Sequence, residues 1–145
     1  MLHMRLFTRS LLVAAIALTA SASCKKEERS GVPYTTVDIT INVNNPAYAD
    51  IQVPGGWVYL SGGSLGILVY RKTIDQFMAY DRHCPYQPEN LCHVIVDDSQ
   101  VMVRDTLCCG SAFVIVDGSV AAGPASTNLR QYNTMFNGTS LRIYN

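Results

Sequence analysis

The chain reads TLCCGS at residues 106–111, and an earlier stretch reads HCPY at residues 83–86. The pair Cys92-His93 lies just beyond the earlier stretch. Thiol and imidazole groups are the soft and borderline donors that bind transition metals, and cysteine thiols also pair as disulfides. The two stretches therefore predict a site made from two loops, provided that the strands around them bring the loops together.

These strands are predicted from their apolar pattern. Residues 93–96 and 100–104 carry valines at every second position and flank the turn residues 97–99, which is typical of a hairpin. Because this hairpin lies between the two cysteine stretches, we expect it to bring them together in space. The apolar stretches 65–70 and 76–80 predict a second hairpin that leads directly into the first cysteine loop.

Further strands follow from the same reasoning. Asp-Gly and Asn-Gly pairs, which favour short hairpins, occur towards the C-terminus. No stretch after Cys24 shows clear helical periodicity, so we expect one all-β domain over residues 36–145, built as a sandwich or barrel. The remaining strands are expected at residues 37–43, 51–53, 57–60, 112–116, 119–122, 129–136 and 139–144.

The N-terminus is predicted to be a signal peptide that covers residues 1–23. Arginines precede a short apolar run at residues 11–20, and this run is too short to cross a membrane. Small residues then precede Cys24, in a pattern that resembles a bacterial lipoprotein box and implies a lipid on Cys24. The alternative is an ordinary secretory signal in which Cys24 has no special role.

The charged residues that follow Cys24 predict a flexible tether over residues 24–35. Acyl chains on Cys24 would anchor the protein in the bacterial cell envelope without spanning the bilayer. A lipoprotein signal favours the outer membrane in a double-membraned bacterium, at either its periplasmic or its surface face.

Composition excludes several classes of function. The chain has 145 residues, is 48% hydrophobic and has a formal net charge of zero, which fits one folded domain without a nucleic-acid partner. It has no phosphate-binding loop, serine-nucleophile motif or zinc-protease motif. Asp97, Asp98 and Asp105 flank turns or strand ends, where we expect them to be solvated. We therefore do not expect an enzyme and assign no catalytic residues.

The order of the motifs resembles a Rieske domain, the all-β module that holds a 2Fe–2S cluster between two loops. The resemblance implies stacked antiparallel sheets, three in the usual domain, with the two cysteine loops at one tip. The family's loops read Cys-x-His and Cys-x-x-His, because two thiolates hold one iron and two imidazoles hold the other. The matching pieces are, in order, the hairpin before Cys84, Cys84-Pro85, residues 108–113 (CCGSAF), Asp117-Gly118, residues 123–125 (GPA), Leu129, Tyr132 and the last hairpin.

Three of the family's four ligand positions are changed in this chain. Tyr86 stands at the first histidine position, Thr106 at the second cysteine position and Cys109 at the second histidine position. The resemblance thus implies that the scaffold is kept and that the ordinary cluster is lost. It also matches Cys108 to a cysteine that forms a disulfide in the family, and Cys92 is the candidate partner.

The four cysteines leave several interpretations open. The first has two disulfides, Cys92–Cys108 and Cys84–Cys109, formed in the oxidising envelope, because a bond between the neighbours Cys108 and Cys109 would be strained. The second has a mononuclear metal such as zinc. The third has a 2Fe–2S cluster with altered ligands, and the fourth has free thiols with a redox role. Metal donors would come from Cys84, Cys92, Cys108, Cys109, His83 and His93.

We therefore expect an envelope-anchored Rieske-like lipoprotein without a cofactor, whose loops are tied by disulfides. Its expected role is structural, or binding to an envelope protein or ligand that the sequence does not name. The alternative is an electron-transfer protein that holds a 2Fe–2S cluster or a mononuclear metal such as zinc through altered ligands.

Overall fold

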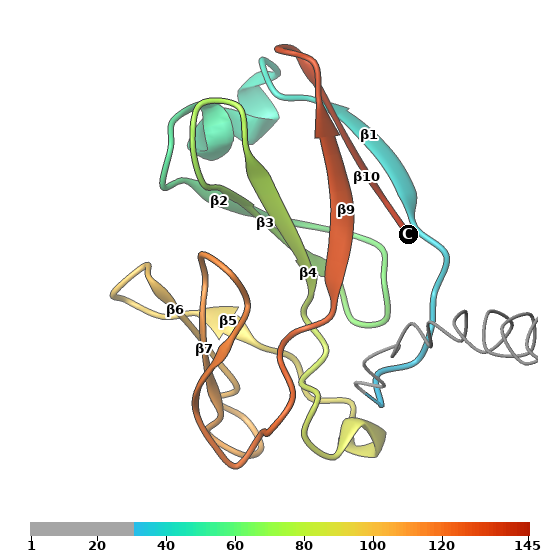
Figure 1. Cartoon of the computed structure of the whole chain (residues 1–145), viewed down its shortest axis with the longest axis vertical. Helices are drawn as coiled ribbons and strands as arrows, with labels where there is room; N and C mark the ends of the chain where they lie inside the picture. The colour runs from blue at the N-terminus through green and yellow to red at the C-terminus, as the bar shows by residue number, and fades with distance from the viewer. Residues whose placement is uncertain (1–30) are drawn as a thin grey trace, which may run out of the picture.

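The computed structural model describes residues 31–145, which form ten strands and two short 3₁₀ helices. All strand pairs are antiparallel, and they form one six-stranded and one four-stranded sheet (Figure 1). The predicted all-β class is confirmed. The predicted signal peptide and Cys24 lie outside the described residues. Between residues 31 and 145, no helix has the length and apolar character needed to cross a membrane.

The larger sheet consists of two three-stranded halves. Its order is β1-β10-β9-β4-β3-β2, and β4 joins β9 through only two residue pairs, Ala79 with Tyr132 and Tyr80 with Gln131. Inward side chains from both halves share one core, which includes Ile41, Ile67 and Leu141. The sheet contains β1 (Asp38–Asn42), β2 (Trp57–Leu60), β3 (Ile67–Arg71), β4 (Phe77–Asp81), β9 (Gln131–Phe136) and β10 (Ser140–Tyr144).

The smaller sheet carries the expected hairpins on either side of the second cysteine loop. Its order is β5-β6-β7-β8, and a second core, which includes Leu68, Val94 and Phe113, packs it against the larger sheet. Its strands are β5 (Ile95–Val96), β6 (Met102–Arg104), β7 (Ala112–Val114) and β8 (Val120–Ala122). The two halves of the larger sheet, together with the smaller sheet, correspond to the stacked antiparallel sheets that the resemblance implied.

One expected strand is absent from the described chain. Residues 51–53 were expected to be extended, but Pro46–Gln52 form the 3₁₀ helix η1. The Asn45 side chain accepts a hydrogen bond from the Ala47 backbone N–H, and proline occupies the start of the helix, as helix N-termini favour. So short a helix has no periodicity that the sequence could reveal. A second 3₁₀ helix, η2 (Pro88–Asn90), lies in the first cysteine loop.

The end of the predicted tether lies against the folded domain. The Arg130 guanidinium donates hydrogen bonds to the carbonyl oxygens of Val32 and Pro33, and the Asn145 side chain donates to the carbonyl of Thr35. Val32 is buried. Residues 32–35 are therefore part of the packed body.

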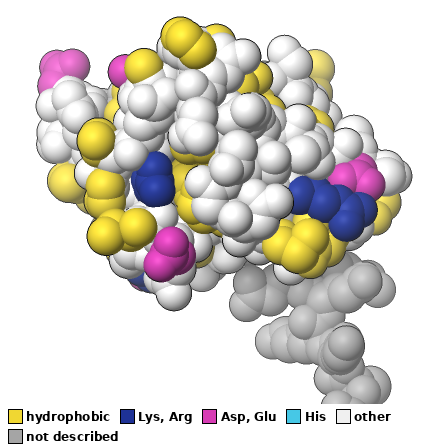
Figure 2. All heavy atoms as spheres, turned by 90° about the horizontal axis from the view of Figure 1, so that it is seen from above, with side chains coloured by type: hydrophobic (Ala, Val, Ile, Leu, Met, Phe, Trp, Pro, Cys, Tyr) yellow, Lys and Arg dark blue, Asp and Glu magenta, His cyan; other side chains and the backbone are white. Residues whose placement is uncertain are grey.

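Charged side chains are sparse on the face of the molecule that is seen from above in Figure 2. Most of this face is uncharged, and apolar side chains are scattered over it. Basic and acidic side chains lie next to one another at one edge, so no broad area of a single charge covers this face.

Candidate functional site

The first cysteine loop begins at a buried carboxylate. Asp81 ends β4, and its side chain accepts hydrogen bonds from the backbone N–H groups of Ser64 (2.7 Å) and His83 (2.9 Å) and from the Tyr132 hydroxyl (2.6 Å). Asp81 is fully buried. These contacts fix the direction in which the chain leaves the larger sheet, and so they position Cys84.

The two histidines do not join the cysteines in a cluster of donors. His83 is buried, and its ring nitrogens lie 2.8 Å from Ser64 Oγ and 2.7 Å from the carbonyl oxygen of Pro88. Because a carbonyl only accepts, Nε2 donates to Pro88, and Nδ1 is hydrogen-bonded to the Ser64 hydroxyl. His93 forms a backbone bridge with His83 and is half-buried. Among the described residues, no group of three close metal donors includes either imidazole, so the expectation that they serve as ligands finds no support.

A disulfide joins the two loops. Cys92 in the first loop is bonded to Cys108 in the second, which is the pairing that the resemblance implied. A bond that closes a loop of this length stabilises the fold by about 3 kcal/mol, mainly by restricting the unfolded chain. Because the sulfurs of Cys92 and Cys108 are bonded to each other, neither can act as a thiolate ligand of a metal.

The expected second disulfide is not formed in this structure. Cys84 and Cys109 are free thiols whose Sγ atoms lie 3.7 Å apart, one in each loop. Cys109 Sγ contacts Asp105 Oδ2 at 3.1 Å and Ser111 Oγ at 3.0 Å. The Cys109 sulfur therefore has polar contacts within its own loop as well as the contact with Cys84.

Asp105 organises the second loop, and its role is missed by the sequence analysis. It is fully buried, whereas we expected it to be solvated. Its Oδ1 accepts hydrogen bonds from the backbone N–H groups of Leu107 and Cys108, which is the geometry of an Asx turn. Burial alone would raise the pKa of Asp105. Hydrogen bonds from Cys108 and from the thiols of Cys109 and Cys84 outweigh burial and lower that pKa below its ordinary value.

Cys84 is a buried and protonated thiol. Burial is the main cause that raises its pKa to about 12, with Asp105 and Cys109 adding to the effect. Because the thiolate is the reactive form of cysteine, Cys84 is a poor nucleophile at neutral pH. The Ser111 hydroxyl, which contacts Cys109, also accepts a hydrogen bond from the Ala125 backbone N–H and so links the Gly-Pro-Ala segment to the site.

The donors gathered at the tip differ from those of a Rieske cluster. Cys84, Asp105 and Cys109 offer ligand atoms that all lie within 4.8 Å of one another. Tyr86 packs against the second core, and Thr106 is exposed. A Rieske cluster needs two thiolates and two imidazoles, so the residues present do not fit it.

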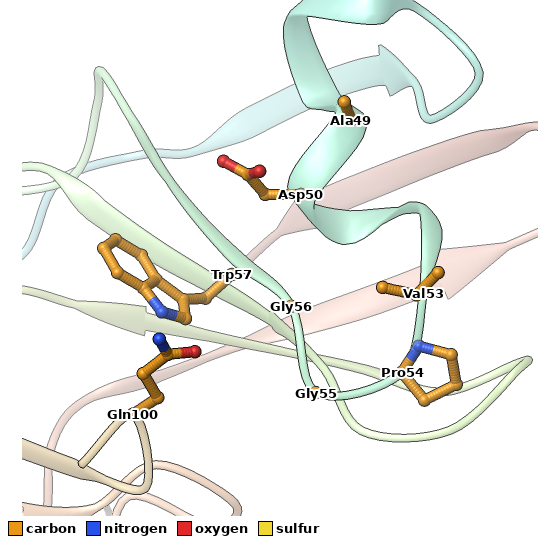
Figure 3. A pocket seen from close by; sticks show the side chains of 8 residues that line it. All are labelled: Ala49, Asp50, Val53, Pro54, Gly55, Gly56, Trp57 and Gln100. Atoms are coloured by element: carbon orange, nitrogen blue, oxygen red, sulfur yellow. The ribbon is translucent and has the colours of Figure 1, made fainter. Parts of the chain in front are cut away.

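An open surface pocket lies at the other end of the β5–β6 hairpin. It has a volume of about 670 Å³, and Trp57, Asp50 and Gln100 are among the side chains that line it (Figure 3). Gln100 belongs to the turn of the hairpin, whereas the cysteine loops adjoin the opposite ends of β5 and β6. The pocket is therefore distinct from the cysteine site.

The fold is shared with solved structures. The plasma membrane Rieske protein PetC3 from the cyanobacterium Synechocystis PCC 6803 matches with a TM-score of 0.55 and 20% identity, over 72% of this chain and 99% of that chain. The complex of reduced oxygenase and oxidized ferredoxin in carbazole 1,9a-dioxygenase matches with a TM-score of 0.50 and 17% identity, over 74% and 93%. The domain has a Rieske-like fold.

The other comparisons give no further information about the function of this Rieske-like domain. The ferredoxin of carbazole 1,9a-dioxygenase from Nocardioides aromaticivorans IC177 matches with a TM-score of 0.48 and 15% identity, over 77% of this chain and 98% of that chain. No protein-family model matches the sequence, and neither does any curated protein. At these identities the likeness concerns the fold, and the site is interpreted from its own residues.

Proposed function

We propose that this Rieske-like domain works without the family's 2Fe–2S cluster, as an envelope-anchored protein with a structural or binding role. One observation carries the proposal: Cys84 Sγ and Cys109 Sγ lie only 3.7 Å apart, at two of the positions that hold iron in the family. The other two positions, Tyr86 and Thr106, carry neither a thiol nor an imidazole. A 2Fe–2S cluster takes four such donors.

The tip is held together by other means. The Cys92–Cys108 disulfide links the loops, and the carboxylate of Asp105 ties the second loop to itself. These contacts hold the two loops in place, as a cluster does when it bridges them. A structural or binding role therefore needs no iron.

Exposed leucines beside the disulfide support a binding role for the tip. Leu91 is 63% exposed and Leu107 is 71% exposed, and each directly precedes a cysteine of the disulfide. Leu91 also has a left-handed backbone, with φ of 55°, which costs a non-glycine residue about 1–2 kcal/mol. Apolar side chains held out on a cross-linked tip suit contact with an envelope partner.

A lipid on Cys24 would keep the domain close to the membrane. Only residues 25–31 lie between Cys24 and the packed segment 32–35. Fully extended, these residues reach at most about 25 Å. The proposed anchor therefore places the domain beside the bilayer of the envelope.

Metal analysis tests the absence of the cluster. The full chain is expressed with its signal in an iron-replete bacterium, and iron, acid-labile sulfide and visible absorption are measured. We expect a colourless protein without iron or sulfide; two irons and two sulfides per chain would overturn the proposal and favour the electron-transfer alternative.

A restored variant supplies the matched control. Tyr86→His, Thr106→Cys and Cys109→His together recreate the family's ligand set on the same scaffold. Uptake of iron by this variant, but not by the natural chain, would show that the host can load a cluster and that the ligand changes prevent it.

A further inference from the structure

Three potential metal ligands converge at the tip from two different loops. Cys84 follows β4, whereas Asp105 and Cys109 follow β6, and their ligand atoms lie within 4.8 Å of one another. Cys84 and Asp105 are fully buried, and Cys109 is partly exposed. A cation bound by all three would be enclosed by protein and reached from the side of Cys109.

The charge of this group favours a cation. The described residues form two ion pairs, Arg104 with Asp97 and Arg142 with Asp38, and Asp105 belongs to neither. A buried charge is costly unless it is paired or coordinates a metal. Asp105 accepts hydrogen bonds from the thiols of Cys109 and Cys84. A cation bound in place of these two protons would interact with the carboxylate more strongly.

The distances match one tetrahedral ion. Two thiolates that each lie about 2.3 Å from zinc are about 3.8 Å apart when the geometry is tetrahedral, and the Sγ atoms of Cys84 and Cys109 are separated by 3.7 Å. A disulfide needs about 2.05 Å. The contact of 3.1 Å between Cys109 Sγ and Asp105 Oδ2 is shorter than the sulfur–oxygen edge of about 3.6 Å at zinc, so binding requires a small rotation of the carboxylate.

One surrounding hydrogen bond supports a thiolate ligand. The backbone N–H of Ser111 donates to Cys109 Sγ at 3.4 Å. Hydrogen bonds to a charged ligand stabilise and orient it, as the outer contacts of metal sites do.

We propose that Cys84, Asp105 and Cys109 bind one divalent d¹⁰ cation of the zinc class, with a fourth position left for an external ligand. Binding deprotonates two thiols, forms two metal–sulfur bonds and one metal–oxygen bond, and releases two protons to solvent. Three protein ligands with one open position is the arrangement of zinc sites that exchange a ligand. The inference rests on the proposed function, because it requires that the tip holds no 2Fe–2S cluster.

Cadmium is the probe for this site, because its bonds to thiolates absorb in the ultraviolet. Iron-free full chain in detergent, with the Cys92–Cys108 disulfide intact, is titrated with Cd²⁺ and then with Zn²⁺ in competition. We expect one Cd²⁺ per chain and an absorption band that Zn²⁺ removes. Cys84→Ser and Cys109→Ser should each lower the band by about half and weaken binding by at least about 100-fold.

Two further variants make the assignment specific. Asp105→Asn should keep the thiolate band but weaken Cd²⁺ binding by at least about 10-fold, because the loss of even an outer-sphere partner of a metal site costs about that much. His93→Asn is the matched control, because His93 lies beside the disulfide but is not one of the three donors. This variant should bind Cd²⁺ with the same affinity as the natural chain. Circular dichroism confirms that each variant is folded before it is titrated.

Two results would overturn the metal site. One is an iron-free protein with two alkylatable thiols that binds no Cd²⁺, and the other is an intact mass that shows a second disulfide between Cys84 and Cys109. Both leave the proposed absence of the cluster intact. Iron with acid-labile sulfide would instead defeat the proposed function, so the two failures are distinguishable.

Discussion

The hydroxyl of Tyr132 donates a hydrogen bond of 2.6 Å to the carboxylate of Asp81, in the buried space where β9 meets β4. β4 and β9 share only two residue pairs there, so this side-chain contact reinforces a short backbone junction. It also fixes the point at which the first cysteine loop leaves the sheet.

Tyr132→Phe removes this donor and keeps the ring. We expect the free energy of unfolding to fall by about 1.5–3 kcal/mol, because the lost bond is made to a charged acceptor. Chemical denaturation measures the change, with Tyr34→Phe as the control, since Tyr34 is 72% exposed. Equal stability of the two variants would contradict this role for Tyr132.

Removal of the disulfide should weaken the whole domain. Cys92→Ser with Cys108→Ser should lower the free energy of unfolding by about 2–4 kcal/mol. Denaturation of the natural chain with and without a reductant gives an independent measure of the same bond. If the reductant leaves the midpoint unchanged, the bond does not contribute to stability.

Replacement of Arg71 by lysine should destabilise the domain. Its buried guanidinium donates to the carbonyl oxygens of Gln52 and Ile74 and lies 5.0 Å from the ring centre of Phe77. Lysine lacks the planar fork, so at least one carbonyl loses its partner, at a cost of about 1–3 kcal/mol. Thermal unfolding should show a clear loss for Arg71→Lys and almost none for Lys72→Ala at the exposed neighbouring position.

Asp97 should give an acid-dependent contribution to stability. Hydrogen bonds from Ser99 and then the contact with Arg104 lower its pKa below the ordinary value. The folded state therefore binds this proton less readily than the unfolded state does. The contribution is present above the unfolded pKa, which is about 3.9, and it is lost as the pH falls through the lower folded pKa.

Carboxyl carbon NMR measures the titration of Asp97 directly. Ser99→Ala and Arg104→Gln should each raise the pKa of Asp97 towards its ordinary value, since the side-chain hydrogen bonds from Ser99 and Arg104 are the two largest causes that lower it. An unchanged titration in Ser99→Ala would refute the assigned cause.

Cys24→Ala should release the protein from the membrane. If Cys24 carries the lipid, this change removes the acyl chains and shifts the chain from the membrane fraction to the soluble fraction. Mass spectrometry of the purified chain reports the acyl mass, and Cys109→Ser is the control that keeps it. An acylated Cys24→Ala chain would place the lipid elsewhere.

Most of the strand pairing could be predicted because it depends on local signals. Valines at every second position and the Asp-Gly and Asn-Gly turns predicted hairpins that the structure contains as β5–β6, β7–β8 and β9–β10. The 3₁₀ helix η1 could not be predicted in the same way. It depends on its asparagine cap and on carbonyl contacts with Arg71, which is distant in sequence.

The candidate site was predicted only in part. The order of the motifs implied the Cys92–Cys108 bond, which the structure contains. Burial of Asp105 could not be inferred, because it results from the way the whole loop folds around one carboxylate. The available signal was an aspartate two and three residues before Leu107 and Cys108, the spacing of an Asx turn.

The link between Cys92 and Cys108 also bears on how the protein matures. An inserted cofactor must be assembled and delivered before a domain that depends on it is complete. A tip that is closed by two of the chain's own sulfurs needs only an electron acceptor. Under the proposed function, such a chain would cross a membrane unfolded and reach its final form on the far side, independently of any iron supply.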